Sequence, residues 1–205
     1  MAPYMNFNLK AIAKSEAQTL LNDYHYLTKE SRGFRSGYNY GAFINDTLVA
    51  VCIFHNPSVP EVVKGCFGLE RNEQEGIFEL GRLVKLPNTD IILSQFVAHA
   101  MKALRRETQV KAILSYADSR FHTGFIYQAL NFKYYGMTAP KTDFWFEQED
   151  GSYIKHVRGK VKGAKGVWKP RSRKYRYLMV YDKYLTPQWR EETYPKKDNI
   201  EYVKI

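Results

Sequence analysis

The alternation of apolar and polar positions is clearest between residues 77 and 136, where it predicts strands and helices in turn. Residues 77–84 form an apolar run of strand length that stops before Pro87. Residues 90–107 carry apolar side chains at spacings of three and four, which indicates a helix with one buried face. The pattern then predicts a strand over 111–117, a short helix over 122–130 and a strand over 132–135.

This compact strand–helix–strand unit also predicts where a ligand binds. A crossover of this length joins parallel neighbouring strands, with the helix packed across them. Ligands of such sheets bind beyond the carboxyl ends of the strands. Those ends are residues 85–89 and 117–120, so we expect the functional site there.

The rest of the chain completes a mixed α/β sheet flanked by helices, in one domain over residues 1–205. Ser15 is the expected N-cap of a helix that runs to about Tyr24. Asn45-Asp46 is a turn-forming pair that predicts a hairpin. The remaining expected features are an edge strand (5–13), the hairpin strands (40–44 and 48–54), a long flap-like loop (55–76), an aromatic strand (144–146), a basic loop (151–176), a last strand (175–181) and a tail without an assigned role (186–205).

The composition of the chain indicates the cellular compartment in which we expect the protein. The N-terminal residues lack the basic and apolar regions of a signal peptide, and the sequence lacks an apolar run of transmembrane length. Cys52 and Cys66 lie in apolar company and indicate buried thiols rather than a disulfide framework. We therefore expect a cytoplasmic protein that does not span a membrane.

The net charge of +10 is concentrated in one stretch. Residues 151–181 hold ten Lys or Arg and no acid, whereas the rest of the chain carries as many basic as acidic residues. Such a concentration predicts a polyanionic partner. Arginines beside tyrosines in the first loop add phosphate-binding and base-stacking groups. The expected DNA contacts are Arg32, Arg35, Lys155, Arg158, Lys160, Lys162, Arg171, Arg173, Lys174 and Arg176.

Three residues near the expected site are candidates for chemistry, and each has a structural alternative. Tyr127 either protonates a leaving group or is simply part of the core. Asp118 either accepts a proton or caps the following helix. Arg82 interrupts an apolar strand, so it either forms a buried ion pair with Glu79 or Asp118 or holds an anionic or amide group in the cleft.

The order of these elements resembles the core of the GNAT acyltransferases. The segment "GFIYQALNFKYYG" places Gly124, Tyr127 and Gly136 where that superfamily has a small residue, a tyrosine and a closing glycine. The resemblance implies that backbone groups of Leu83 and Val84 bind the pantetheine arm of acetyl-CoA, and that Tyr127 protonates the departing thiolate. The usual glycine-containing phosphate loop is replaced here by residues 87–93.

A more extensive resemblance links the chain with the Mom DNA-modification family of phages. It is carried by the segments "DYHYLTKESRGFRSGYNYGAF", "FELGRLV", "ILSYADSRFHTGFIYQALNF" and "PRSRKYRYLMVYDK". By this resemblance, the protein converts adenine in phage DNA to N6-carbamoylmethyladenine, which blocks host restriction enzymes. Carried over by position, the functional residues are Tyr26, Arg82, Ser94, Asp118 and Tyr127.

The resemblance also implies the partners. The family is linked with acetyl-CoA and with iron, although the sequence indicates no set of metal ligands. Double-stranded DNA is the expected substrate, with the adenine flipped out of the duplex because its N6 is paired inside the helix. Two alternatives remain at this point, namely an acetyltransferase for a protein or small amine and a DNA-binding protein without catalysis. The sequence leaves the oligomeric state open.

Overall fold

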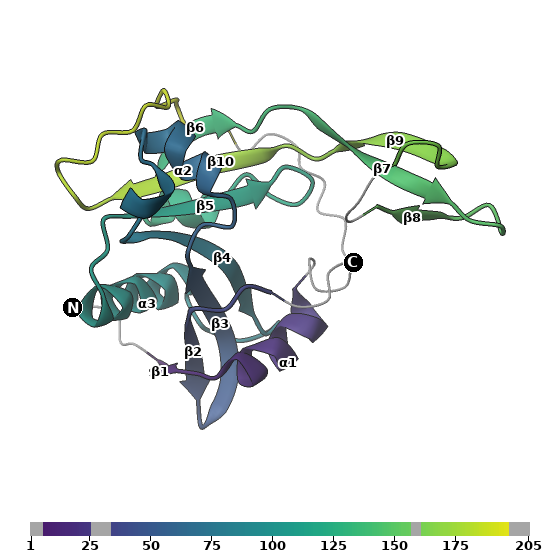
Figure 1. Cartoon of the computed structure of the whole chain (residues 1–205). Coiled ribbons are helices and arrows are strands. Elements are labelled where there is room, and N and C mark those ends of the chain that lie inside the picture. Colours follow the sequence, from purple (N-terminus) through teal and green to yellow (C-terminus); the bar gives the residue numbers. More distant parts are fainter. Residues whose placement is uncertain (1–5, 26–33, 157–160, 197–205) are drawn as a thin grey trace.

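The computed structural model describes residues 6–25, 34–156 and 161–196 (Figure 1). Its centre is a seven-stranded mixed sheet with the order β1-β2-β3-β4-β5-β10-β6. These strands are β1 (Asn8–Ala11), β2 (Tyr38–Ile44), β3 (Thr47–His55), β4 (Ile77–Lys85), β5 (Ala112–Asp118), β10 (Lys174–Val180) and β6 (Lys133–Met137). The ladder between β4 and β5 is parallel, as the spacing of the elements predicts, and the other ladders of this sheet are antiparallel.

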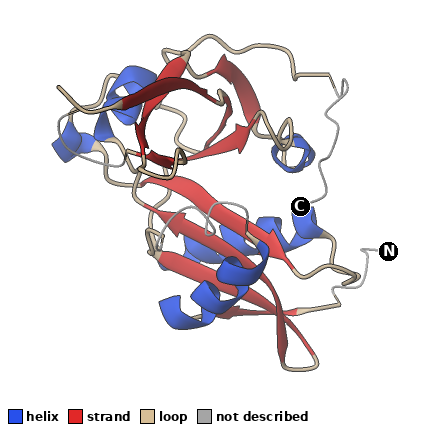
Figure 2. Ribbon diagram, turned by 90° about the vertical axis from the view of Figure 1, so that its right-hand side faces the viewer, coloured by secondary structure: helices blue, strands red, loops and turns tan. Residues whose placement is uncertain are grey.

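Helices cover both faces of the sheet (Figure 2). Alternate residues of β3 point to opposite sides, so Val51 and Ile53 pack with α1 (Lys14–Tyr24). Cys52 and Phe54 belong instead to the core that contains α3 (Leu93–Glu107). The short helix α2 (Pro60–Phe67) packs on the same side as α1, against β4, β5 and β10. The sheet is therefore buried on both faces, which explains the near-continuous apolar runs in its central strands.

Helix starts are the main local difference from the sequence prediction. Helix α1 begins at Lys14, and the Glu16 carboxylate accepts a hydrogen bond of 2.7 Å from the Ala13 N–H, so Ser15 is not the N-cap. Helix α3 begins at Leu93 rather than residue 90. Helix α4 (Phe125–Ala129) begins after Gly124, whose φ of +85° is left-handed and breaks the helix expected from residue 122.

Two segments expected as loops contain regular structure. Residues 55–76 hold α2 and the 3₁₀ helix η1 (Arg71–Glu73) instead of a continuous flap. The basic segment also forms strands: β8 (Tyr153–Lys155) and β9 (Gly166–Arg171) pair with either side of β7 (Lys141–Glu147). This three-stranded sheet, which we call the arm, projects beyond the central sheet (Figure 1).

The arm is inserted into a hairpin between β6 and β10. These strands are antiparallel neighbours, and the Thr138 N–H donates to the Lys174 carbonyl at 2.8 Å. The chain therefore leaves the central sheet after β6 and returns at β10 almost at the same place.

The end of the described chain packs on this part of the sheet. Glu192 forms a bridge with Tyr134, and the Tyr194 hydroxyl donates to the Phe132 carbonyl at 2.8 Å. The part of the expected tail up to residue 196 is thus bound to the domain. Within the described ranges, no helix is long and apolar enough to cross a membrane.

Candidate functional site

The candidate site lies where β4 and β5 separate. Their parallel ladder ends at Leu80 and Ser115, after which β4 continues beside β3 and β5 continues beside β10. A bulge in the β3–β4 ladder falls at the same point, since Ile53 pairs with Arg82 and Phe54 with Leu80, which leaves Gly81 between them. A bulge bends its strand and redirects the following side chains. The opening is therefore built into the sheet at the carboxyl ends of β4 and β5.

Gly81 is needed at this bulge because the His55 ring packs against it. A Cβ added at residue 81 would lie only 2.8 Å from Cδ2 of His55. The sequence prediction did not single out Gly81, although an isolated glycine within a strand pattern is a signal of a bulge or of a close approach.

A cavity of about 320 Å³ fills the opening between the two strands. It brings together Arg82, Asp118 and Tyr127, the three residues proposed from the sequence to carry chemistry. The complete lining is His25, Glu79, Leu80, Gly81, Arg82, Leu83, Leu93, Tyr116, Asp118, His122, Phe125, Ile126, Tyr127 and Lys174. The site thus combines cationic, anionic and neutral polar groups with an apolar wall.

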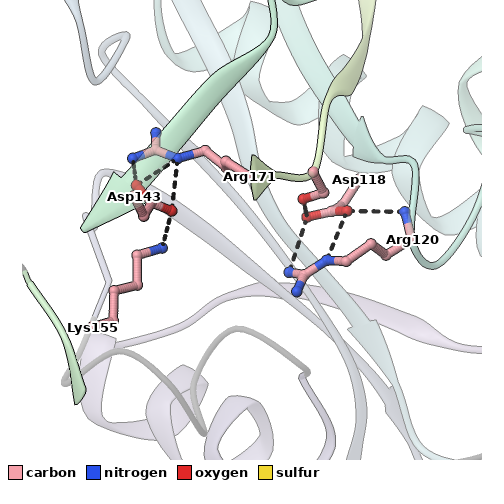
Figure 3. A network of polar contacts seen from close by, with 6 residues as sticks. Asp118, Arg120, Asp143, Lys155 and Arg171 are labelled. Carbon is pink, nitrogen blue, oxygen red and sulfur yellow. Dashed lines mark hydrogen bonds and ion pairs between the residues drawn. The ribbon is translucent and has the colours of Figure 1, made fainter. Parts of the chain in front are cut away.

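Asp118 is held as a carboxylate by several hydrogen bonds (Figure 3). Its Oδ1 accepts from the Arg120 N–H at 3.0 Å, and its Oδ2 accepts from the Ser172 hydroxyl at 2.8 Å. Arg120 also contacts both oxygens through its guanidinium group, each at 3.4 Å. Burial raises the pKa of Asp118, but these hydrogen bonds outweigh it and bring the pKa below its usual value. Asp118 is consequently ionised and a weak proton acceptor at neutral pH.

Asp118 does not cap the following helix, as one of the two alternatives predicted, but belongs to a turn. The Asp118 carbonyl accepts from the N–H groups of Phe121 and His122, and helix α4 starts only at Phe125. Asp118 therefore fixes the turn over residues 118–122 instead of the first turn of a helix.

Tyr127 is both a core residue and a wall of the cavity. Its side chain is 5% exposed, and its ring lies 5.1 Å from the Tyr177 ring and 5.7 Å from the Phe132 ring. The two alternatives drawn from the sequence are therefore not exclusive, because the same buried ring lines the cavity.

Two histidines of the cavity are neutral at pH 7. Burial, Arg82 and His122 lower the pKa of His25 to about 4. Burial also lowers the pKa of His122, against the opposing effect of Asp118. The Gly124 N–H donates to Nδ1 of His122 at 3.1 Å, which leaves the proton of the neutral ring on Nε2. His122 is thus prepared to donate a hydrogen bond.

Lys174, one of the expected DNA contacts, lies in the wall of the cavity. It pairs with Asp118 in the β5–β10 ladder, and its partly buried side chain lines the cavity. Burial lowers the pKa of Lys174, while the nearby carboxylates of Asp118 and Glu79 oppose that shift. The sequence did hold a signal for this position. The alternating pattern of residues 175–181 can be extended to residue 174, and this places Lys174 beside Asp118, the last residue of β5.

The residues expected to bind acetyl-CoA lie beside the same opening. Leu83 lines the cavity, whereas the Val84 side chain is buried in the cluster with α1, so only its backbone is available to a ligand. Ser94 lies in the first turn of α3, next to the cavity residue Leu93. Beyond Leu80 the side of β4 that faces β5 has no ladder partner among the described strands. This edge and the first turn of α3 fit an extended pantetheine arm and a phosphate group.

The described residues do not offer a donor set for iron. Within 6–25, 34–156 and 161–196, no three His, Cys, Asp or Glu side chains are grouped to hold a metal ion. His25 and Asp118 both line the cavity, but the oxygens of Asp118 already accept hydrogen bonds from Arg120 and Ser172. The link with iron drawn from the family resemblance therefore finds no support in this part of the chain.

The expected DNA-binding residues divide into several environments. Lys155 and Arg171 both bind the Asp143 carboxylate, Lys155 at 2.8 Å (Figure 3). Arg176 stacks on the Trp189 ring at 4.4 Å. Lys162, Arg173 and Arg35 are exposed, and Arg35 lines a separate cavity at the start of β2. The sequence prediction missed Asp143, whose place on β7 puts it between β8 and β9. Tyr26, Arg32, Arg158 and Lys160 lie outside the described residues.

Comparisons with known proteins identify both a family and a fold. The model of the Mom protein family matches residues 6–196. A comparison with curated proteins finds no match. Solved structures with a similar fold include an IAA acetyltransferase from Bacillus cereus, which is 10% identical, with 85% of this chain and 99% of that chain covered and a TM-score of 0.51.

Two further acetyltransferases show the same similarity. The ribosomal-protein-S18-alanine N-acetyltransferase from Escherichia coli is 10% identical, with 86% of this chain and 94% of that chain covered and a TM-score of 0.50. A probable acetyltransferase from Staphylococcus epidermidis is 12% identical, with 85% and 98% covered and a TM-score of 0.50. At these identities the similarity establishes the fold, which is GNAT-like as the order of elements predicts.

Proposed function

Because the chain belongs to the Mom protein family, we propose that it is a transferase that modifies adenine in DNA. The product we propose is N6-carbamoylmethyladenine in phage DNA, formed in the host cytoplasm and protecting that DNA from restriction. The observation that carries the proposal is the cavity between β4 and β5, where Arg82, Asp118 and Tyr127 converge in a member of this family.

The size and walls of the cavity suit a single base beside a small donor group. Its volume of about 320 Å³ falls at the lower end of small-ligand pockets, roughly 300–1,000 Å³. Leu83, Leu93 and Ile126 provide apolar surface for a flat ring. A base inside a duplex cannot reach such a cavity, so the adenine enters it flipped out or from a single strand.

Arg82 and Tyr127 are the groups we assign to the reacting atoms. Adenine N6 is a poor nucleophile because its lone pair is delocalised into the ring, so the site must orient the amine and stabilise the charge that develops. Arg82 supplies a permanent cation at the bend of β4, and its Nη1 donates to the Gly81 carbonyl at 2.7 Å, which fixes its position. Tyr127 supplies a phenol that can give or take a proton.

Asp118 and the neutral histidines have different roles in this proposal. Asp118 keeps its charge and holds Ser172 and the turn over residues 118–122 at the mouth of the cavity. The neutral ring of His122 can donate a hydrogen bond from Nε2 to the substrate without adding positive charge. The cavity thus retains one permanent guanidinium cation, Arg82, close to a buried anion.

Acetyl-CoA is the donor that the unpaired edge of β4 fits. When bound, it would supply an acetyl group, whose transfer to N6 with loss of the thiolate gives N6-acetyladenine. The carbamoylmethyl product bonds N6 to the methylene carbon instead, so it also requires an amino donor for the amide nitrogen and a two-electron oxidant. Backbone groups of Leu83 and Val84 would hold its pantetheine arm, and Ser94 would lie near its phosphates at the first turn of α3.

Nucleoside mass spectrometry of DNA from cells that express the protein tests this function. Wild type should yield a new deoxyadenosine species, whose mass separates a carbamoylmethyl from an acetyl group. Tyr127→Phe and Arg82→Gln should lower its yield by roughly 10²-fold or more, the size expected for lost acid–base or charge stabilisation. Asp118→Asn should also lower the yield, because Arg120 and Ser172 lose the charged acceptor that holds them at the cavity. Tyr135→Phe is the matched control, because Tyr135 is equally buried but packs in the cluster around α2. Unmodified DNA with folded wild-type protein would refute the proposal.

The fold itself also suits a second function, N-acetylation of a protein or small-molecule amine. This alternative is favoured by the unpaired edge of β4, which would accept the same donor for any amine. An acetylated acceptor found together with unmodified DNA would establish it.

A further inference from the structure

The arm has two chemically different faces. Residues that pair across its strands point to the same side, so Asp143 shares a face with Lys169, and Trp145 shares it with Lys155 and Val167. We call this side the lysine face; it carries Lys141, Asp143, Trp145, Glu147, Tyr153, Lys155, Val167, Lys169 and Arg171. The opposite side carries Phe144, Phe146, Ile154, Trp168 and Pro170.

The lysine face keeps an excess of positive charge after its acids are accounted for. Asp143 binds Lys155 and Arg171, and Glu147 binds Lys165 at 2.9 Å. None of the ion pairs formed by the described residues involves Lys141 or Lys169. These two lysines, one on each of the paired strands β7 and β9, are the cations most available to an incoming anion.

Lys169 also stands over two aromatic rings. Its Nζ lies 4.9 Å from the centre of the Trp145 ring and 4.4 Å from that of Tyr153. Both side chains are partly accessible, and Tyr153 is 37% exposed. A cation–π contact at an exposed site is weak, so the ammonium group can turn to a phosphate and leave the rings to unstacked bases. Lysines beside aromatic rings are the combination that single-stranded nucleic acid binding uses.

The lysine face and the cavity are linked at the root of the arm. Arg171 binds Asp143 on the arm, and the next residue, Ser172, donates to Asp118 in the cavity (Figure 3). Two residues further on, Lys174 is itself part of the cavity wall. A DNA strand whose phosphates bind along the lysine face therefore comes close to the cavity that its base would enter.

We propose that the lysine face of the arm holds the DNA strand next to the target adenine. Lys141 and Lys169 bind phosphates, and Trp145 and Tyr153 stack with bases that leave the duplex. This inference rests on the proposed function. It changes part of the set expected from the sequence. Lys155 and Arg171 bind Asp143 within the arm and Lys174 lines the cavity, whereas Lys141, Trp145 and Tyr153 enter as new contacts.

The test is a binding titration with a fluorescent oligonucleotide that contains adenine, single-stranded and as a duplex, without a donor and over a range of salt. Lys169→Ala should weaken binding to all sequences and reduce the slope of log K against log salt by about 1. Trp145→Ala should weaken single-strand binding roughly tenfold, and Trp145→Phe should restore most of it.

Two matched controls separate the lysine face from general effects. Lys102→Ala removes an exposed lysine of α3, and Trp168→Ala removes a 60% exposed tryptophan from the opposite face of the same arm. Both should bind DNA within about twofold of wild type, since we place neither at the DNA. An unchanged salt slope in Lys169→Ala would overturn the proposal, as would equal losses in Trp145→Ala and Trp168→Ala. Tighter binding of RNA than of DNA of the same sequence would overturn the choice of partner.

This titration and the nucleoside measurement fail independently. Salt-dependent binding that Lys169→Ala weakens, in a protein that leaves DNA unmodified, would support the lysine face and refute the proposed chemistry. Modified DNA, together with wild-type binding in both Lys169→Ala and Trp145→Ala, would support the proposed chemistry and refute the role of the lysine face. Lys169 is exposed, so its replacement keeps the test valid even where Trp145→Ala fails to fold.

Discussion

At the scale of residues, burial shifts the pKa values of two groups of the cavity in opposite directions, upward for Asp118 and downward for His25. Asp118 is buried but stays ionised, because Arg120 and Ser172 donate to its oxygens. His25 is buried and stays neutral, because desolvation and the positive charge of Arg82 both disfavour its imidazolium form. The charge of Asp118 therefore depends on hydrogen-bond donors from the turn after β5 and from the link between β9 and β10, whereas the neutral state of His25 depends on burial and on Arg82.

The neutral His25 predicts a loss of stability on acidification. Its pKa is about 4 in the folded protein, against 6.5 for a histidine exposed to water, so the unfolded chain binds the proton first as the pH falls. Its stabilising contribution is complete above pH 6.5 and is lost as the pH approaches 4, by roughly 3 kcal/mol at 1.36 kcal/mol per pKa unit.

Urea unfolding at pH 7, 5.5 and 4 measures this effect. His25→Gln should flatten the fall of the free energy of unfolding across this range. His99→Gln, at an exposed histidine of α3, should retain the wild-type dependence. Parallel curves for wild type and His25→Gln would contradict the assignment.

At the scale of elements, the start of α4 determines how Tyr127 faces the cavity. Gly124 has a left-handed backbone, and a Cβ added there would lie 2.8 Å from Cζ of Tyr177 and 3.0 Å from Cδ2 of Tyr127. The same element is held by the Tyr177 hydroxyl, which donates to the Thr123 carbonyl. The position of the candidate phenol is thus set by a glycine and a second tyrosine, not by α4 alone.

Gly124→Ala is predicted to destabilise the protein strongly. The left-handed backbone costs about 1 kcal/mol for alanine, and overpacking against two rings adds about 1–3 kcal/mol. Gly151→Ala is a matched control, because Gly151 has a φ of +78° but no atom within 4 Å of the added Cβ. Chemical denaturation should show a loss of about 1 kcal/mol for Gly151→Ala and at least twice that for Gly124→Ala. Equal losses of stability in the two variants would show that the Tyr127 and Tyr177 rings make room for the added Cβ without an energetic penalty.

At the scale of the whole molecule, a compact domain carries an arm that branches from one hairpin. The strands of the arm pair with one another and not with the central sheet. The chain returns close to where it left, since Thr138 and Lys174 are hydrogen-bonded neighbours. The main link between the arm and the cavity that we identify is the Ser172–Asp118 hydrogen bond at the root of the arm.

The arm is therefore predicted to be removable without unfolding the domain. Replacing residues 140–171 by a short Gly-Asn turn should leave a folded protein, with cooperative thermal unfolding and a near-UV circular dichroism spectrum characteristic of fixed packing. Its DNA affinity should fall to that of a weak, non-specific binder. A molten or aggregated product would show that the arm is part of the folding unit.

The sequence by itself determined the central unit. The apolar periods over residues 77–136 predicted the parallel β4–β5 pair and the helix between them, and the carboxyl ends of those strands are where the cavity lies. It also predicted the hairpin at Asn45 and Asp46, both of which have positive φ. The pattern raised Arg82, Asp118 and Tyr127 as candidates with structural alternatives, and the resemblance to the Mom family selected them as functional residues; the cavity brings all three together.

Only the tertiary structure decided the remaining features, because they depend on strands that are distant in sequence. The basic segment became an arm, and Asp143 came to neutralise Lys155 and Arg171, through the pairing of β7 with β8 and β9. Lys174, an expected DNA contact, lines the cavity because β10 lies beside β5. Charge counted along a chain cannot show which side chains face one another, since strand pairing and register decide that.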